Sequence, residues 1–347
     1  MTEEKTISAS TIQPTKGIHE TFQLSESLVP RIFIGLWQTS SPAWGSSPGF
    51  KIKKHFQKLV EAGFTAFDMA DHYGDAELIF GRFRSQYKGP ESIYCATKIC
   101  FFNPITPTSE MLRANVTQRL KNIKSDKIDL CQFYIQYCNN GEHLDALKFL
   151  QGDERISALG VVNMETEKME QVLDAGINVV SNQVQFSLID SRPTMKMGTA
   201  CRKHDVKLLT YGTLCGGFIA DKWLGKPQPD LYGEGMTPSH RKYFEEIRAW
   251  GGWQLFQELL SVLSQIAQKH SVSMSNVGTR WVLDHDFVGA VIVGTRMGVS
   301  DRTQDNLPVY GWKLDRDDQE LVEQVLRKSR RDEMFQQMGD CGAEYLA

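Results

Sequence analysis

The chain has 347 residues, of which 41% are hydrophobic and 23% charged, and its formal net charge is −3. This composition is typical of a globular protein in water and allows one large domain. No basic block or stripe occurs, so we expect neither nucleic acid nor a membrane as partner. Residues 1–30 lack the apolar core of a signal peptide, and no apolar run reaches membrane-spanning length. We expect a cytoplasmic protein with a flexible N-terminal arm, residues 1–25, and a single domain, residues 26–347.

The cysteines indicate neither disulfides nor a metal site. Their number is odd, no CxxC pair occurs, and no cluster of cysteine and histidine has ligand spacing. We therefore expect free thiols in a reducing compartment and no bound metal. The seven cysteines are Cys95, Cys100, Cys131, Cys138, Cys201, Cys215 and Cys341.

Short apolar runs rich in β-branched and aromatic residues recur along the chain. Their nearly continuous hydrophobicity is typical of parallel strands that are buried on both faces. The runs lie at residues 31–37, 64–69, 92–98, 127–134, 156–162, 177–184, 206–211 and 289–294.

The segments between these runs have helical periodicity and glycine stops, as in "HFQKLVEAG" at residues 55–63. Eight strand–helix alternations predict an α/β fold, a closed (β/α)8 TIM barrel. The alternative is a doubly wound open sheet, which usually carries a G-x-G-x-x-G turn after its first strand. No such turn follows residues 31–37. We further expect a long, partly helical loop after the seventh strand, at residues 212–253, and a C-terminal helical segment.

Candidate catalytic residues lie where the strands end, because such barrels carry their active sites there. Asp68 ends the second run, Tyr73 follows five residues later, and Lys98 ends the third run. A lysine cation beside a tyrosine favours the phenolate and should lower the tyrosine pKa from about 10. Such a tyrosine can give a proton to a carbonyl oxygen. The structural alternative is an ion pair of Asp68 and Lys98 inside the barrel.

An ordered set of motifs resembles the aldo-keto reductases, with features of a microbial-type branch. The stretch "GFTAFDMADHYGDAE" is followed by "CATK", "GVVN", "VSNQVQFS", "LLTYGTL" and "VIVGTR". The match runs from about residue 31 to about residue 330. It implies an NADP(H)-dependent barrel acting on a small-molecule substrate without metal. It also implies that Asp68, Tyr73 and Lys98 match three members of a catalytic tetrad, with Tyr73 as the proton donor.

The resemblance further implies a set of cofactor and substrate contacts. An arginine fork suits a phosphate, so Arg296 should favour NADP over NAD. The implied nicotinamide contacts are Asn163, Gln183 and Tyr211. The implied pyrophosphate loop, residues 212–217, includes Gly212, Leu214 and Gly216. Gly294 and Arg296 would face the adenosine phosphate, and Gln304 and Asn306 would contact the adenine. Apolar walls of the substrate pocket are expected from Trp37, Phe218 and Trp223. Outside this context Asn163 and Gln183 read as strand-end turn formers, Arg296 as a solvated loop charge, and Tyr211 as a core aromatic.

The fourth tetrad position departs from the family pattern. Related chains carry a histidine at the end of the fourth strand, where this chain has Tyr134. A phenol still donates one hydrogen bond, but it is larger and titrates far higher. His72 is a conceivable substitute. Val162 also stands where a serine or threonine is usual, and one hydroxyl contact to the carboxamide is therefore lost.

These features favour an NADP(H)-dependent oxidoreductase acting on a carbonyl or conjugated enone, with a place in specialised metabolism. In the related steroid double-bond reductases a glutamate at the histidine position accompanies a change from C=O to C=C reduction, so Tyr134 can redirect the chemistry. One alternative is a non-redox isomerase, dehydratase or cyclase that uses the same site. The other is a non-catalytic NADP(H)-binding sensor. The oligomeric state is open.

Overall fold

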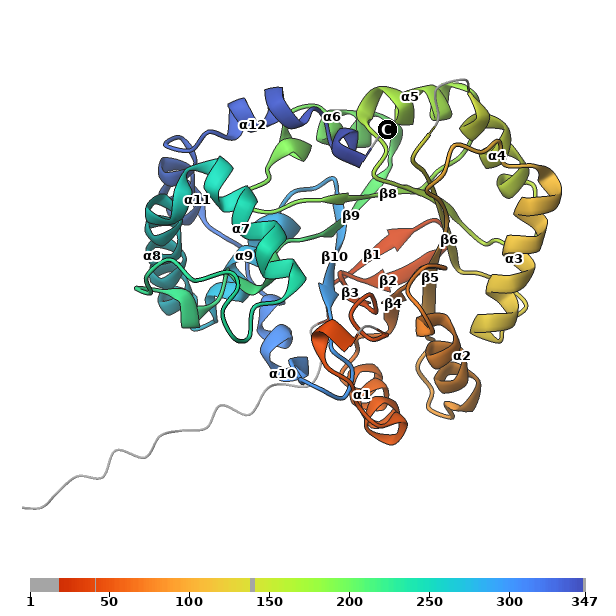
Figure 1. Ribbon diagram of the computed structural model, residues 1–347, viewed down its shortest axis with the longest axis horizontal. Coiled ribbons are helices and arrows are strands. Elements are labelled where there is room, and N and C mark those ends of the chain that lie inside the picture. The colour runs from red at the N-terminus through yellow and green to blue at the C-terminus, as the bar shows by residue number, and fades with distance from the viewer. Residues whose placement is uncertain (1–18, 41, 138–140, 346–347) are drawn as a thin grey trace, which may run out of the picture.

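A computed structural model describes residues 19–40, 42–137 and 141–345. It contains a closed barrel of eight parallel strands, in which the last strand pairs with the first. The barrel strands are β3 (Ile32–Gly35), β4 (Ala66–Asp68), β5 (Tyr94–Phe101), β6 (Leu130–Ile135), β7 (Leu159–Val162), β8 (Ser181–Gln185), β9 (Lys207–Tyr211) and β10 (Val288–Gly294). Each falls on one of the eight predicted runs, and the predicted (β/α)8 barrel is confirmed (Figure 1).

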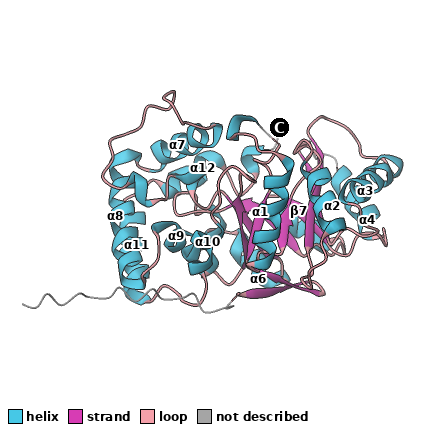
Figure 2. Ribbon diagram, turned by 90° about the horizontal axis from the view of Figure 1, so that it is seen from below, coloured by secondary structure: helices cyan, strands magenta, loops and turns pink. Residues whose placement is uncertain are grey.

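Helices surround the barrel on all sides (Figures 1 and 2). Those that connect barrel strands are α1 (Gly49–Glu61), α2 (Ala76–Gln86), α3 (Ser109–Ile123), α4 (Glu142–Gln151), α5 (Thr166–Asp174), α6 (Met197–His204) and α9 (Met274–Leu283). Helix α3 starts where the Thr108 side chain accepts a hydrogen bond from the Met111 N–H, which caps the first turn. No helix in the described part of the chain is long and apolar enough to span a bilayer.

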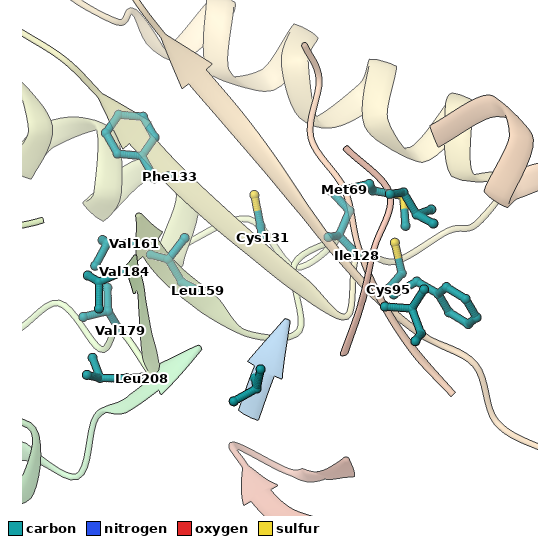
Figure 3. Close-up of a cluster of buried hydrophobic side chains, with 14 of the residues drawn as sticks. Met69, Cys95, Ile128, Cys131, Phe133, Leu159, Val161, Val179, Val184 and Leu208 are labelled. Atoms are coloured by element: carbon teal, nitrogen blue, oxygen red, sulfur yellow. The ribbon is translucent and has the colours of Figure 1, made fainter. Parts of the chain in front are cut away.

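Alternation along the strands divides the barrel core in two. Outward-facing residues such as Cys95, Cys131 and Phe133 pack under the helices, as Figure 3 shows for part of this cluster. Inward-facing residues such as Ala66, Ala96 and Leu130 fill the barrel near the strand starts. Because side chains alternate with period two, the next inward residues along each strand form the layer above, toward the C-terminal mouth.

A hairpin of β1 (Thr21–Leu24) and β2 (Ser27–Pro30) covers the floor of the barrel. An added Cβ at Gly289 would lie 2.3 Å from the Phe22 ring, so β10 and the hairpin are in direct contact. Glu20 forms an ion pair with the fully buried Arg280 at 2.9 Å. Residues 19–25 of the expected arm are therefore part of the fold, and residues 1–18 lie outside the described residues.

The loop after β9 and the C-terminal helices build a second core beside the barrel. Its helices are α7 (Pro238–Trp250), α8 (Gly252–His270), α11 (Arg316–Leu326) and α12 (Arg331–Met338). The short elements are η1 (Pro42–Trp44), η2 (Arg192–Thr194), η3 (Cys215–Gly217), η4 (Asp221–Trp223), α10 (Thr303–Asn306), η5 (Leu307–Val309) and η6 (Ala343–Tyr345). The expected partly helical loop and C-terminal helical segment are both present. After α12 the last described residues return to the barrel, where Tyr345 contacts Tyr211 of β9.

Candidate functional site

A layer of polar side chains lies inside the barrel, one step above its apolar floor. Asp68, Lys98, Gln132 and Gln183 face inward at alternating positions, and all four are buried. Lys98 and Gln132 are register partners on β5 and β6. Lys98 does not end its strand as expected, because β5 continues to Phe101.

The Asp68 carboxylate is the centre of this layer. One oxygen accepts a hydrogen bond from Lys98 Nζ at 2.7 Å. The other accepts from the amide nitrogens of Gln132 at 3.0 Å and Gln183 at 2.7 Å. Gln183 Nε2 also donates to the Gln132 carbonyl oxygen at 2.9 Å. A buried carboxylate with three donors is well satisfied and holds the lysine in one place.

The Lys98 cation faces the Tyr73 ring, with Nζ 4.9 Å from the ring centroid. Burial disfavours the cation, but Asp68 and Tyr73 outweigh this effect and raise the pKa of Lys98 above its ordinary value. Burial also raises the pKa of Tyr73 to about 12, while the Lys98 charge acts in the opposite direction. The expected net lowering of the Tyr73 pKa is therefore wrong, because desolvation of the phenolate exceeds the attraction of the cation.

Aromatic rings surround the Tyr73 side of the mouth. The His72 ring lies 4.6 Å from Tyr73 and 4.9 Å from Phe102 between centroids. Phe102 in turn lies 5.4 Å from Tyr134. Tyr134 follows Gln132 by two positions on β6 and so faces inward one step higher, at the far end of this row of ring contacts. Its place as the fourth tetrad member stays a prediction. Its hydroxyl donates to the backbone oxygen of Tyr345 at 3.4 Å. His72 Nδ1 lies 3.2 Å from the Asp71 carboxylate.

The expected nicotinamide contacts come from β7, β8 and β9. Asn163 follows β7 with a φ of 49°, a left-handed conformation that asparagine tolerates better than most residues. Its amide oxygen accepts a hydrogen bond from the Tyr211 hydroxyl at 3.0 Å. The Gln183 amide nitrogen is already bound to Asp68 and Gln132, which leaves its carbonyl oxygen for a ligand.

The expected phosphate contacts form a positively charged region beyond β9 and β10. The loop after β9 has positive φ at Gly212, Gly216 and Gly217, a backbone arrangement that can present N–H groups to an anion. Within the described chain no carboxylate pairs with the half-buried Arg296. Burial, Arg302 and Arg296 together lower the pKa of Lys222. Gly294 and Gln304 are exposed and Asn306 is half-buried on the same side.

The three residues expected to form pocket walls differ in how far their side chains are exposed. Trp37 is 48% exposed and packs against Trp44, with ring centroids 4.7 Å apart. Trp223 is half-buried and donates from its indole to the Gly217 carbonyl. Phe218 is fully buried in the second core and offers no surface to a substrate, so its expected role as a pocket wall is wrong.

Four residues at the site were absent from the sequence-based set: Phe102, Gln132, Lys222 and Tyr345. Gln132 leaves a signal, since it is an amide within an otherwise apolar strand. Phe102 was not expected at the site because β5 extends further along the chain than its predicted strand. Tyr345 carries no local signal, because only the path of the chain after α12 brings it to the barrel.

Comparisons with known proteins identify the family of the chain. The model of the Aldo/keto reductase family matches residues 31–327, and the chain belongs to this family. The family is one of oxidoreductases that act on small-molecule substrates and generally use NAD(P)H.

Several individual proteins are similar to this chain. The chloroplastic pyridoxal reductase of Arabidopsis thaliana is 25% identical over 308 residues, 82% of this chain and 80% of that protein. Flagellar radial spoke protein 5 of Chlamydomonas reinhardtii is 29% identical over 134 residues, and this match spans 38% of this chain but only 25% of that protein. The structure of a glycerol dehydrogenase from Gluconobacter oxydans has a TM-score of 0.69 at 22% identity, covering 90% of this chain and 96% of that one.

Proposed function

We propose that this protein is an NADP(H)-dependent reductase of a carbonyl or conjugated enone in a small organic molecule. The observation that carries the proposal is the buried layer in which Asp68 holds Lys98 against Tyr73, with Nζ 2.7 Å from the carboxylate. Two further observations support it. Amide and phenol groups lie at the ends of β7 and β9, and no carboxylate among the described residues pairs with the Arg296 cation.

The residues present fit a nicotinamide dinucleotide. The Asn163 amide and the Gln183 carbonyl oxygen would hold the carboxamide, and the Tyr211 ring would pack on the nicotinamide face. Arg296 and Lys222 would hold an adenosine 2′-phosphate, which NADP carries and NAD lacks. When bound, the reduced cofactor would supply a hydride to the substrate.

The chain's own side chains would then control the proton. Tyr73 would donate the proton from its hydroxyl to the substrate oxygen, or to the carbon or oxygen that becomes basic in an enone. Lys98 would stabilise the resulting phenolate, since its cation faces the ring, and Asp68 would keep that cation fixed. Tyr134 would donate one hydrogen bond to the substrate carbonyl, in the role that a histidine has in related chains.

The surroundings of Tyr73 indicate the kind of substrate. The His72 ring contacts Tyr73, and Phe102 and then Tyr134 continue a row of aromatic rings from it. Such a row beside the proton donor favours a flat, apolar substrate body. We also propose a role in specialised metabolism, in which such substrates are common. A cytoplasmic location is proposed on the cysteine pattern, and the six cysteines among the described residues are free thiols, with Cys138 outside them.

The first test is a titration of the purified protein with NADPH and with NADH, followed by quenching of tryptophan fluorescence. We expect saturable quenching and tighter binding of NADPH. The variant Arg296→Gln should weaken NADPH binding about 10-fold to 100-fold and leave NADH nearly unchanged, as loss of a charge-assisted phosphate contact predicts. Arg316→Gln, at an exposed position on α11, is the matched control.

Addition of a panel of carbonyls and enones then tests the chemistry. Loss of absorbance of the reduced nicotinamide would support a working reductase. Binding of NADPH without any oxidation would point to the non-redox or sensor alternatives, and no binding at all would overturn the proposed function.

A further inference from the structure

The last described residues of the chain lie against the residues that we assign to the nicotinamide and the substrate. We call residues 339–345 the C-terminal strap. An added Cβ at Gly342 would lie 2.1 Å from the Asn163 carbonyl oxygen, so the strap directly contacts the turn after β7. The strap ends at Tyr345, whose backbone oxygen accepts the hydrogen bond from Tyr134. A carbonyl of the chain itself therefore holds the donor that the proposed function assigns to a substrate carbonyl.

The Tyr345 side chain also joins the expected nicotinamide contacts. Its hydroxyl oxygen lies 3.2 Å from that of Tyr211 and accepts a hydrogen bond from Lys242 Nζ at 2.9 Å. The Tyr211 hydroxyl in turn lies 3.0 Å from the Asn163 amide oxygen. A phenol has a single proton. If Tyr211 donates that proton to Asn163, its contact with Tyr345 is a hydrogen bond only when Tyr345 is the donor. The strap is thus part of a hydrogen-bond chain that runs through Tyr211 to Asn163 and uses polar atoms of both.

The strap has a root that is packed into the core and an end that contains no buried residue. At the root, the Asp340 carboxylate accepts from the Thr166 backbone N–H at 2.9 Å, and Cys341 is buried in the main core. The end, η6 (Ala343–Tyr345), is one short turn with no buried residue. Gly342 lies between the two parts with a φ of +90°. Such an end can detach without unfolding the root.

One ion pair fastens the end of the strap. Arg192 donates to both oxygens of Glu344, at 2.8 Å and 2.6 Å. Arg192 is buried, but it also makes two hydrogen bonds to Asp190, at 2.8 Å and 2.9 Å. Release of Glu344 therefore leaves no unpaired buried cation, which is the usual large cost of breaking such a pair. The ion pair between Arg192 and Glu344 can therefore open without a large desolvation cost.

From these contacts we propose that the C-terminal strap is an intramolecular occupant of the active site, and that nicotinamide binding and docking of the strap end exclude each other. The inference rests on the proposed function of the same site. In the closed form Tyr345 holds Tyr134 and Tyr211, and the Asn163 turn is covered by Gly342. Cofactor binding displaces residues 343–345, while Asp340 and Cys341 stay in place.

The test compares NADPH affinity in the full-length protein and in two full-length variants. Glu344→Gln weakens the ion pair to Arg192, and Tyr345→Ala removes the phenol. If the strap holds the site closed nine-tenths of the time, its removal tightens the apparent Kd about tenfold. Glu333→Gln, at an exposed acidic position on α12, should keep the wild-type Kd. Amide hydrogen exchange in residues 343–345 should rise when NADPH is added to the wild-type protein.

The outcomes separate this inference from the proposed function. An unchanged or weaker NADPH Kd in both variants, with unchanged exchange in the strap, would overturn the inference and leave the proposed function standing. If neither the wild type nor either variant binds NADPH, the proposed function fails and the inference fails with it. Because the two variants act on different contacts, misfolding of one still leaves the other to decide.

Discussion

At the scale of single residues, the protonation state of Tyr73 determines how the proposed reduction depends on pH. Reduction needs the neutral phenol, and burial raises the pKa of Tyr73 to about 12. The hydroxyl therefore stays protonated at ordinary pH, and activity that depends on it is lost only as pH rises toward that value. We predict a kcat for reduction, at saturating NADPH, that is level from about pH 6 to about pH 10. A fall in kcat above about pH 8 would instead indicate a Tyr73 pKa lowered by Lys98.

How far single residues could be predicted depended on where they stand in the chain. Asp68 and Lys98 are charges within apolar runs, so their inward position and their pairing follow from the barrel alone. The balance of burial against charge at Tyr73 depends on how the folded chain encloses its ring, which no sequence pattern gives. His72 contacts that ring and is itself packed against Phe102. Tyr345 was unpredictable for a stronger reason, since 134 residues separate it from Tyr211, its hydrogen-bond partner.

Among the contacts between elements, a largely enclosed acid on α7 forms a hydrogen bond to β8. Glu246 accepts a hydrogen bond from Gln185 at 2.8 Å, and its side chain is 11% exposed. Burial raises the pKa of Glu246 to about 7, with Lys242 opposing and Asp190 adding to the rise. The folded pKa exceeds the ordinary value of 4.5, so the stabilising contribution is complete below about pH 4.5 and is lost as pH rises through about 7.

Glu246→Gln keeps the neutral form at every pH and so tests this sign. We predict that the variant exceeds the wild type in free energy of unfolding by about 1–3 kcal/mol at pH 8.5 and by little at pH 5. Urea unfolding at the two pH values measures the difference. Glu245→Gln, at the exposed neighbouring position, should show no such pH dependence. An equal effect of Glu246→Gln at both pH values would show that the raised pKa of Glu246 does not govern this stability difference.

The barrel elements were predictable because parallel strands buried on both faces leave continuous apolar runs. The end of β5 was not, because residues 99–101 extend the strand by pairing with β6, a contact that a local pattern does not contain. The hairpin β1–β2 was also missed. Its strands are short, and its burial depends on contacts with β10 and the barrel floor.

At the scale of the whole molecule, closure of the barrel brings together residues from strands far apart in the chain. The Asp68 layer joins β4, β5, β6 and β8, and the pairing of β10 with β3 closes the ring of strands around it. The same closure creates one mouth, to which the C-terminal strap returns. Family membership and the order of the strands thus follow from the sequence. The position of the C-terminal strap at the mouth of the barrel follows only from the folded chain.

In the proposed function Tyr73, held by Lys98 and Asp68, is the proton donor of a nicotinamide-dependent reductase. The most direct test of this claim is the rate of NADPH oxidation with an active carbonyl or enone by the wild type, by Tyr73→Phe, and by the control Tyr232→Phe, whose side chain is exposed. We predict that Tyr73→Phe lowers kcat by about 10²-fold to 10⁴-fold and leaves the NADPH Kd unchanged, while the control matches the wild type. A Tyr73→Phe variant that oxidises NADPH as fast as the wild type would contradict the claim.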